Sequence, residues 1–374
     1  MIAGGDRVLH GHVEVRQTRP VIRGFIAVLA LAVVAATTQT AARASGGGPP
    51  PARLAGAVVM GALRAPPSAA FLARVRAGHL GGVILMGRWR SRAEVAAVTA
   101  RLQRAACVAG APLLVATDQE GGRVRRLTWA EPRAAAAEVD SPTQARVEAQ
   151  AAARALRSAG VGIDLAPVAD TPSSSSNFLG DRAFSPNPLL VGELATAFVA
   201  GLQQGGVAAA VKHFPGLGQA ARSTDEGPVT IRAGSVALQR GLRPFRETIT
   251  GGVRLVMVSS ASYPALDPSG RPAVVSPRIV GDLLRGELGF DGVVVTDALD
   301  APAAARIGHA PTKAIVAGVD LLLYASEPAA ERGYATLLAD ARKYPRLRQR
   351  LAAAGERLTA LKSWLAAAGG PSCG

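Results

Sequence analysis

Residues 289–297 read Gly-Phe-Asp-Gly-Val-Val-Val-Thr-Asp, a short apolar run that ends directly in a carboxylate. Three consecutive valines between a glycine turn and a polar residue are typical of a strand buried on both faces, as in a parallel sheet. Parallel strands carry functional groups where each strand ends and its loop begins. We therefore expect a strand at 293–296 and a functional side chain at Asp297.

The same arrangement recurs along the chain. Short apolar runs alternate with longer amphipathic segments, the pattern of β/α units rather than of a β-sandwich. The expected strands are 55–60, 82–86, 112–116, 162–166, 207–212, 255–258, 293–296 and 320–323. The expected helices are 92–108, 143–159, 189–204, 235–250, 277–288, 303–317 and 332–367. Eight units of this size predict an α/β protein with a single (β/α)8 barrel, closed by C-terminal helices. The alternative is an open doubly wound sheet, but no G-x-G-x-x-G turn follows the first strand.

The N-terminal segment indicates export. Two arginines precede the apolar run 25–36, and Ala42-Arg43-Ala44 has the form of a signal-peptidase site. The run is short for a membrane span, which needs about 20 residues, so an uncleaved anchor is the less favoured alternative. We expect a signal peptide at 1–44, a Gly/Pro linker at 45–53 without a helix, a barrel domain at 54–367 and a tail at 368–374. The mature protein is then a secreted or cell-wall-associated monomer that meets the membrane only in transit.

Charge and composition indicate which partners and cofactors to expect. The formal charge is +15, and +12 remains without the first 44 residues, which favours anionic surroundings. Aromatic residues make up only 4% of the chain and no nucleic-acid-binding motif is present, so we expect no nucleic-acid partner. No Cys/His cluster indicates a metal, and we expect no cofactor. Cys107 falls in an expected helix and Cys373 in the tail; a bridge is one alternative, but we favour two free cysteines.

Polar side chains follow the expected strands repeatedly, among them Asp118, Asp170, Lys212 and His213. Burying Lys212 and His213 without compensation is costly, so we place them in a site. The glycines at 121 and 122 allow a tight turn after the third strand.

Some of these polar residues also have a purely structural interpretation. Glu120 and Arg123 form either an internal ion pair or ligand contacts, and Asp170 is either a turn cap or a site residue.

Six stretches together resemble one family. They are Gly81-Gly-Val-Ile-Leu85, Asp118-Gln-Glu-Gly-Gly-Arg-Val-Arg-Arg126, Ala166-Pro-Val-Ala-Asp170, Lys212-His-Phe-Pro-Gly216, Gly289-Phe-Asp-Gly-Val-Val-Val-Thr-Asp297 and Ala317-Gly-Val-Asp320. In sequence and in order they resemble the glycoside hydrolases of family 3, over about residues 54–325. Within the family, the chain is similar to the single-domain β-N-acetylglucosaminidases, since we expect no second folded domain such as the β-glucosidases have.

The resemblance implies a retaining hydrolysis of a terminal β-linked amino sugar, in which Asp297 is the nucleophile that forms a covalent glycosyl-enzyme. It assigns the sugar hydroxyls to Asp118, Arg126, Arg182, Lys212 and His213. It gives no catalytic role to Asp300, which we expect to cap a helix. Whether water or phosphate is the acceptor stays open.

One segment departs from the family pattern. Where those hexosaminidases have an Asp-His pair that protonates the leaving group, residues 217–226 here read Leu-Gly-Gln-Ala-Ala-Arg-Ser-Thr-Asp-Glu. By spacing, Asp225 stands in place of the acid His, and a buried carboxylic acid there is able to donate the proton. Glu226 is the neighbouring candidate.

Two further functions stay open beside the hexosaminidase. One is a catalytically impaired barrel that binds wall glycan, which would fit the missing Asp-His pair and the positive charge. The other is a β-glucosidase-type enzyme of the same family, because the sequence does not identify the group at the second carbon of the sugar.

Overall fold

The computed structural model describes Met1 and residues 49–174 and 177–373. Eight parallel strands form one sheet in the order β10-β1-β2-β3-β6-β7-β8-β9. A bridge between Val295 and Leu321 joins its last and first strands, with Leu321 N donating to Val294 O at 3.0 Å, so the sheet closes into the expected barrel. The strands are β1 Val59–Leu63, β2 Gly82–Leu85, β3 Leu114–Thr117, β6 Ile163–Asp164, β7 Ala208–Phe214, β8 Leu255–Val258, β9 Val293–Thr296 and β10 Leu322–Leu323.

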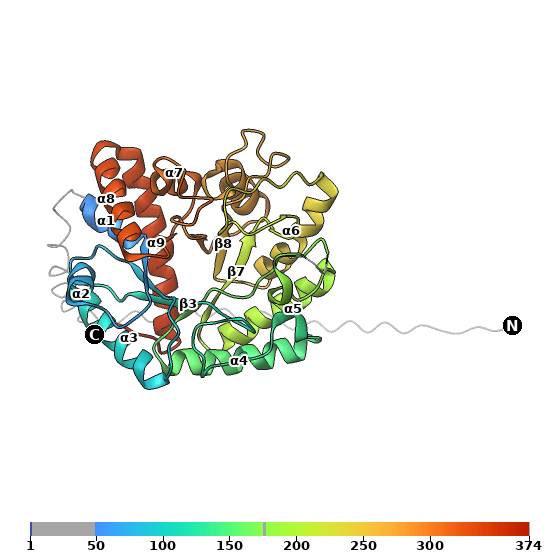
Figure 1. Cartoon of the computed structure of the whole chain (residues 1–374), viewed down its shortest axis with the longest axis horizontal. Helices are drawn as coiled ribbons and strands as arrows, with labels where there is room; N and C mark the ends of the chain where they lie inside the picture. Colours follow the sequence, from blue (N-terminus) through green and yellow to red (C-terminus); the bar gives the residue numbers. More distant parts are fainter. Residues whose placement is uncertain (2–48, 175–176, 374) are drawn as a thin grey trace, which may run out of the picture. The chain divides into compact units, whose positions relative to one another are not determined.

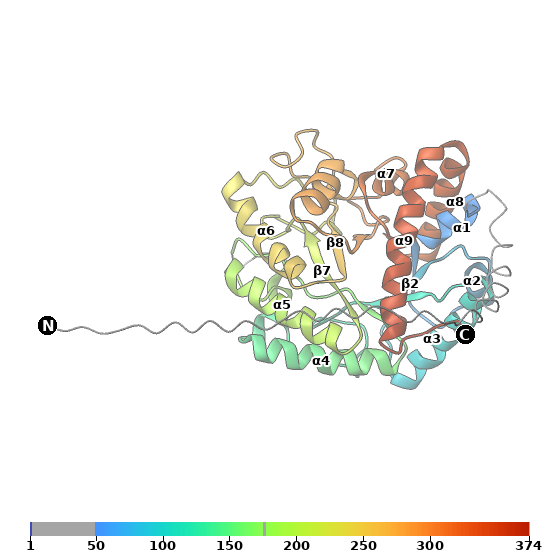
Figure 2. The same cartoon turned by 180° about the vertical axis from the view of Figure 1, so that it is seen from behind.

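Helices surround this barrel, and the views from both sides show them outside the strands (Figures 1 and 2). Polar side chains begin several of them: Ser91 caps α3, Ser141 caps α4 and Asn187 caps α5, each accepting a bond from a backbone N–H of the first turn. The helices are α1 Pro51–Ala57, α2 Ala69–Arg76, α3 Arg92–Val108, α4 Pro142–Ser158, α5 Pro188–Gln204, α6 Ser235–Thr250, the π-helix Arg278–Glu287, α7 Ala310–Ala317, α8 Glu327–Lys343 and α9 Pro345–Ala367.

Four expected elements differ in the structure. The expected strand 55–60 was wrong, because the strand begins only at Val59. Residues 45–48 of the expected linker lie outside the described residues, and its end is helical rather than helix-free, because α1 starts at Pro51; Pro at the first helical position loses no hydrogen bond there. The expected helix 303–317 exists only as α7, because the segment before it makes turns instead. The expected helix 332–367 is two helices, since Pro345 cannot continue α8 and disfavours helical backbone at the residue before it.

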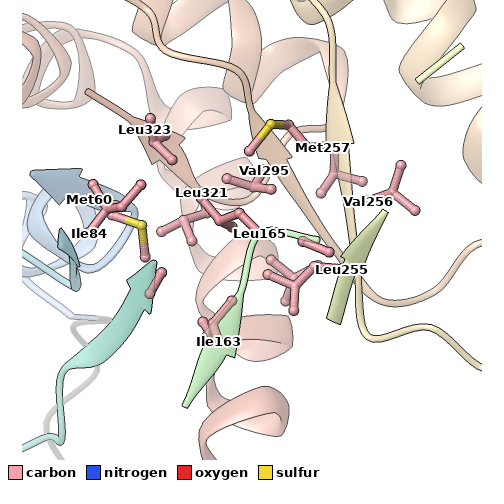
Figure 3. Close-up of a cluster of buried hydrophobic side chains, with 14 of the residues drawn as sticks. Met60, Ile84, Ile163, Leu165, Leu255, Val256, Met257, Val295, Leu321 and Leu323 are labelled. Atoms are coloured by element: carbon pink, nitrogen blue, oxygen red, sulfur yellow. The ribbon is translucent and has the colours of Figure 1, made fainter. Parts of the chain in front are cut away.

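Buried aliphatic side chains fill the barrel. Figure 3 shows Met60, Ile163, Leu255 and Val295 meeting inside the ring of strands. Filling the interior in this way makes the barrel a packed core and not a pore. The upper part of this core reaches the carboxyl ends of the strands, where Ile84, Leu165, Met257 and Leu323 line a cavity.

A disulfide joins Cys107 and Cys373, with the two Cα atoms 5.3 Å apart. The expectation of two free cysteines was therefore wrong. Cys107 lies at the end of α3, next to the start of β3, so the bridge is at the amino end of the strands, opposite the cavity. Helix α9 brings the tail back to α3, as both overall views show (Figures 1 and 2).

Candidate active site

The carboxyl ends of the strands surround a cavity of about 470 Å³. Every residue that the sequence assigned to catalysis or sugar binding lines it, which brings together side chains from several strand ends and their loops. These residues are Asp118, Arg126, Arg182, Lys212, His213, Asp225 and Asp297.

Asp297 directly follows β9, as expected from the valine run. Its backbone N–H donates to Val258 O at 2.9 Å, which ties it to β8. The carboxylate accepts a bond from Ala298 N at 2.8 Å and one from the Thr224 hydroxyl at 3.4 Å. Burial raises the pKa of Asp297; the charge of His213 opposes this rise and the charge of Asp225 adds to it. A partly exposed carboxylate held by two donors at the floor of a cavity suits a nucleophile.

The turn after β3 is a small antiparallel hairpin, β4 Gln119–Gly121 with β5 Val124–Arg125. Gly121 and Gly122 have φ values of 101° and 51°, which other residues rarely adopt, so the expected tight turn is present. The hairpin places Asp118 at the cavity, where its carboxylate lies 2.9 Å from Lys212 Nζ and 3.8 Å from Arg126 Nε.

Lys212 and Arg182 share a buried carboxylate. Glu120 Oε1 lies 2.6 Å from Lys212 Nζ, and Arg182 grips the same carboxylate through Nε at 2.8 Å and Nη2 at 2.9 Å. Burial alone lowers the pKa of Lys212, but Asp118 and Glu120 reverse this and raise it. Lys212 therefore stays cationic although only 3% of its side chain is exposed.

Of the two alternatives left open for Glu120 and Arg123, the ion pair between them is not present. Arg123 instead pairs with Asp181 at 3.1 Å and donates to the carbonyl of Leu179 at 2.7 Å. The two glycines between Glu120 and Arg123 have a left-handed backbone, and the turn that they form carries Arg123 away from Glu120.

His213 is held by Asp170. Its Nδ1 lies 2.7 Å from Asp170 Oδ2, while Oδ1 of the same carboxylate accepts the backbone N–H groups of His213 and Leu217 at 3.2 and 2.6 Å. Asp170 thus orients the imidazole and caps the turn after β7 rather than its own following turn, and it does not itself line the cavity.

The segment 217–226 forms one wall of the cavity. Thr224 is buried, and its carbonyl accepts a bond from Ala303 N at 3.3 Å. Asp225 is exposed and lines the cavity, whereas Glu226 does not line it. The burial expected from the sequence for a carboxylic acid at Asp225 is therefore not present in this arrangement.

Asp300 is not a helix cap, contrary to expectation. Its two oxygens accept bonds from Ala325 N and Ser326 Oγ, both at 2.7 Å. The carboxylate joins the loop after β9 to the loop after β10, because the segment that follows Asp300 makes turns rather than a helix.

Several cavity residues carry no sequence signal. Thr224 touches Asp297 but is a neutral residue in a loop without a motif, and Arg64, Met86 and Phe178 lie alone after or between strands. Arg64 and Met86 directly follow the observed strands β1 and β2, but the expected strand 55–60 ended before Arg64 and the expected strand 82–86 contained Met86, so neither was marked as a residue that follows a strand and faces the site.

The described part of the chain carries neither a metal cluster nor a membrane span. Within residues 49–174 and 177–373, no group of three or more His, Cys, Asp or Glu side chains is arranged to hold a metal ion. In the same residues, no helix has the length and apolar character needed to cross a membrane.

Known proteins share both the sequence and the fold. Residues 58–361 match the model of the glycosyl hydrolase family 3 N-terminal domain. A β-hexosaminidase of Nitrosomonas eutropha is 36% identical over 272 residues, which cover 68% of this chain and 77% of that protein. A β-N-acetylhexosaminidase structure from Beutenbergia cavernae has a TM-score of 0.78 and 32% identity, covering 85% of this chain and all of the other. A β-N-acetylglucosaminidase structure from Paenibacillus has the same TM-score and 33% identity, covering 84% of this chain but only 62% of its own.

Proposed function

This chain belongs to glycoside hydrolase family 3, and from that membership we propose that it is a retaining exo-β-N-acetylhexosaminidase with Asp297 as its nucleophile. The observation that carries the proposal is the position of Asp297 at the end of β9, in one cavity with the five expected sugar-binding residues. The names of the Nitrosomonas and Beutenbergia proteins support the choice of an amino sugar.

The geometry supports a two-step reaction. An oxygen of Asp297 attacks the anomeric carbon as the bond to the leaving oxygen breaks, which gives a glycosyl ester. Ala298 N and the Thr224 hydroxyl donate hydrogen bonds to the carboxylate and fix its position before the sugar binds. A water molecule then attacks the anomeric carbon, releases Asp297 and gives up a proton to the group that acted as acid.

The other side of the cavity holds the sugar. Lys212, Arg126 and Arg182 present donors and Asp118 an acceptor, which matches the alternating donors and acceptors of a sugar ring edge. Because the cavity ends on the packed barrel core, it accepts a chain terminus rather than a chain interior, which supports exo cleavage.

Asp225 is the proposed proton donor, because it lines the cavity and its charge acts on Asp297. Closure of the segment 217–226 around a bound substrate would exclude water from this exposed carboxyl and bring it against the leaving oxygen. The exposure of Asp225 also favours a second candidate function, a barrel that binds wall glycan without cleaving it.

Turnover of aryl substrates tests the proposal. Wild type should cleave aryl β-N-acetylglucosaminide faster than aryl β-glucoside, and Asp297→Ala should abolish both. A 2-fluoro sugar should add covalently to Asp297, seen as a mass increase on its peptide. Saturable glycan binding with neither turnover nor labelling would replace the hydrolase with the binding function.

Export to the cell exterior or wall is the second part of the proposal. The arginines and apolar run before Ala44 support it, as does the Cys107–Cys373 bridge, because disulfides persist in oxidising compartments. The +12 charge of the mature chain suits an anionic wall and its fragments. The N-terminus of the protein recovered from culture medium should lie just after Ala44; intact protein confined to the cytoplasm would contradict export.

A further inference from the structure

Glu120 lies at the centre of the charged cluster, and both of its oxygens are held by cationic side chains. Only 3% of its side chain is exposed, and Lys212 and Arg182 occupy both of its oxygens through three contacts of 2.6 to 2.9 Å. Through these contacts it joins three parts of the barrel mouth: the hairpin after β3, strand β7 and the 3-10 turn Gly180–Arg182.

Asp118 differs from Glu120 in this respect. It contacts Lys212 as well, but 14% of its side chain is exposed, and among the described residues its second oxygen has the more distant Arg126 as its charged partner, at 3.8 Å. Asp118 is thus free to accept a sugar hydroxyl, while Glu120 is committed to the two cations.

The negative charge of Glu120 stabilises the charged forms of Lys212 and Arg182. Burial by itself raises the pKa of Glu120, but Lys212 and Arg182 reverse this and lower it to about 2, so the carboxylate stays ionised over the whole working pH range. Without this charge, Lys212 would be buried beside Arg182 and, among the described residues, would keep Asp118 as its salt-bridge partner. Asp297 and Asp164 would act on it from farther away. Buried cations in that situation lose their proton or move toward water.

We infer that Glu120 is a positioning residue, which keeps Lys212 charged and Arg182 oriented so that both donate to the hydroxyls of the bound sugar. This inference rests on the proposed function for the identity of the ligand. The protonation state of Lys212, on which the inference depends, can be measured even if the enzyme turns over no substrate.

The decisive variant is Glu120→Gln, which keeps the shape and removes the charge. The kcat/KM for aryl β-N-acetylglucosaminide should fall about 100-fold, the size of loss that misplaced positioning groups cause, and most of it should appear in KM. The alkaline limb of the pH–activity profile should also move to lower pH than in wild type, because Lys212 then loses its proton at a lower pH. Acetylation of Lys212 with acetic anhydride, followed by peptide mass spectrometry across pH, should show the same downward shift of its midpoint.

Asp320→Asn is the matched control. Asp320 is equally buried and also bridges two arginines, Arg285 at 2.5 Å and Arg357 at 3.3 Å, but it precedes β10 at the far end of the barrel. Its loss should lower thermal stability without moving the pH profile or the Lys212 midpoint. If Glu120→Gln behaves like this control, Glu120 has a structural role and the inference is overturned.

Two further measurements keep the outcome unambiguous. If wild type turns nothing over, the proposed function fails, while the Lys212 midpoint in Glu120→Gln still decides the role of Glu120. If Glu120→Gln does not fold, the wild-type midpoints decide: Lys212 must titrate above the exposed Lys313. A Lys212 midpoint equal to or below that of Lys313 overturns the inference.

Discussion

The hydroxyl of Thr224 lies 3.4 Å from Oδ2 of Asp297, so a residue of the wall segment 217–226 reaches the proposed nucleophile itself. The segment that departs most from the family pattern in sequence is therefore in direct contact with the floor of the cavity. A hydroxyl that donates to a carboxylate favours its ionised, nucleophilic form.

Replacing Thr224 by Val should weaken the nucleophile. The lost bond should reduce kcat/KM about 5- to 10-fold, the equivalent of ~1 kcal/mol. It should also shift the acid limb of the pH profile upward, because the pKa of Asp297 rises when a donor to its charged form is removed. Thr230→Val, at an exposed threonine, is the control. An unchanged acid limb would show that the 3.4 Å contact has no effect on Asp297.

Removing the charge of Asp225 should have the opposite effect on Asp297. Asp225 raises the pKa of Asp297, so Asp225→Asn should lower it and move the acid limb of kcat/KM to lower pH. Single-substrate pH profiles of wild type and variant measure the shift. A limb that stays in place would mean that the two carboxyl groups are screened from each other.

The same variant tests proton donation by its dependence on the leaving group. If Asp225 is the acid, Asp225→Asn should slow cleavage of sugar or alkyl glycosides by about 100-fold or more. Glycosides with a dinitrophenyl leaving group should lose far less, because that group departs without a proton. Glu226→Gln should affect neither class, since Glu226 lies outside the cavity. Equal losses on both substrate classes would remove Asp225 from the acid role.

Features that repeat along the chain were predictable from sequence. The runs at 255–258 and 293–296 match β8 and β9 residue for residue, and the helices at 92–108 and 235–250 match α3 and α6. Burial on both faces makes such strands apolar throughout, and the polar residue that follows marks the strand end. The amino-acid pattern alone therefore predicts that Asp297 lies at the barrel mouth.

Contacts between distant residues were not predictable. The sequence offered Arg123, three residues away, as one possible partner of Glu120, whereas Arg182, a partner in the fold, is 62 residues away. Cys107 and Cys373 are separated by 266 residues, and they meet because helix α9 returns the C-terminal tail to α3. Thr224 was missed for another reason, because a hydroxyl without charge or motif gives no signal until the fold places it beside Asp297.

Asp164 should make the protein less stable as pH rises. Burial raises the pKa of this fully buried carboxyl well above its usual value, and Oδ2 has no hydrogen-bond partner among the described residues. Unfolded Asp releases its proton near pH 4, but the folded protein keeps it to higher pH, so folding stability falls between these two values as pH increases. Asp164→Asn removes this penalty and should raise Tm at about pH 7 but not at about pH 3.5. A lower Tm at neutral pH would show that Asp164 is ionised in the folded state and supports Lys212.

Loss of the Cys107–Cys373 bridge should reduce stability and leave catalysis intact. The bridge restrains a loop of 266 residues in the unfolded chain, and losing such a restraint typically costs about 2–5 kcal/mol. The double variant Cys107→Ser/Cys373→Ser should therefore melt about 3–7 °C below wild type. Its kcat/KM at room temperature should equal that of wild type, because the bridge lies at the amino end of the strands, opposite the cavity. Reductant should lower the Tm of wild type to that of the variant and leave the variant unchanged. A variant that retains its Tm but loses activity would contradict this, and would mean that the tail acts on the site across the barrel.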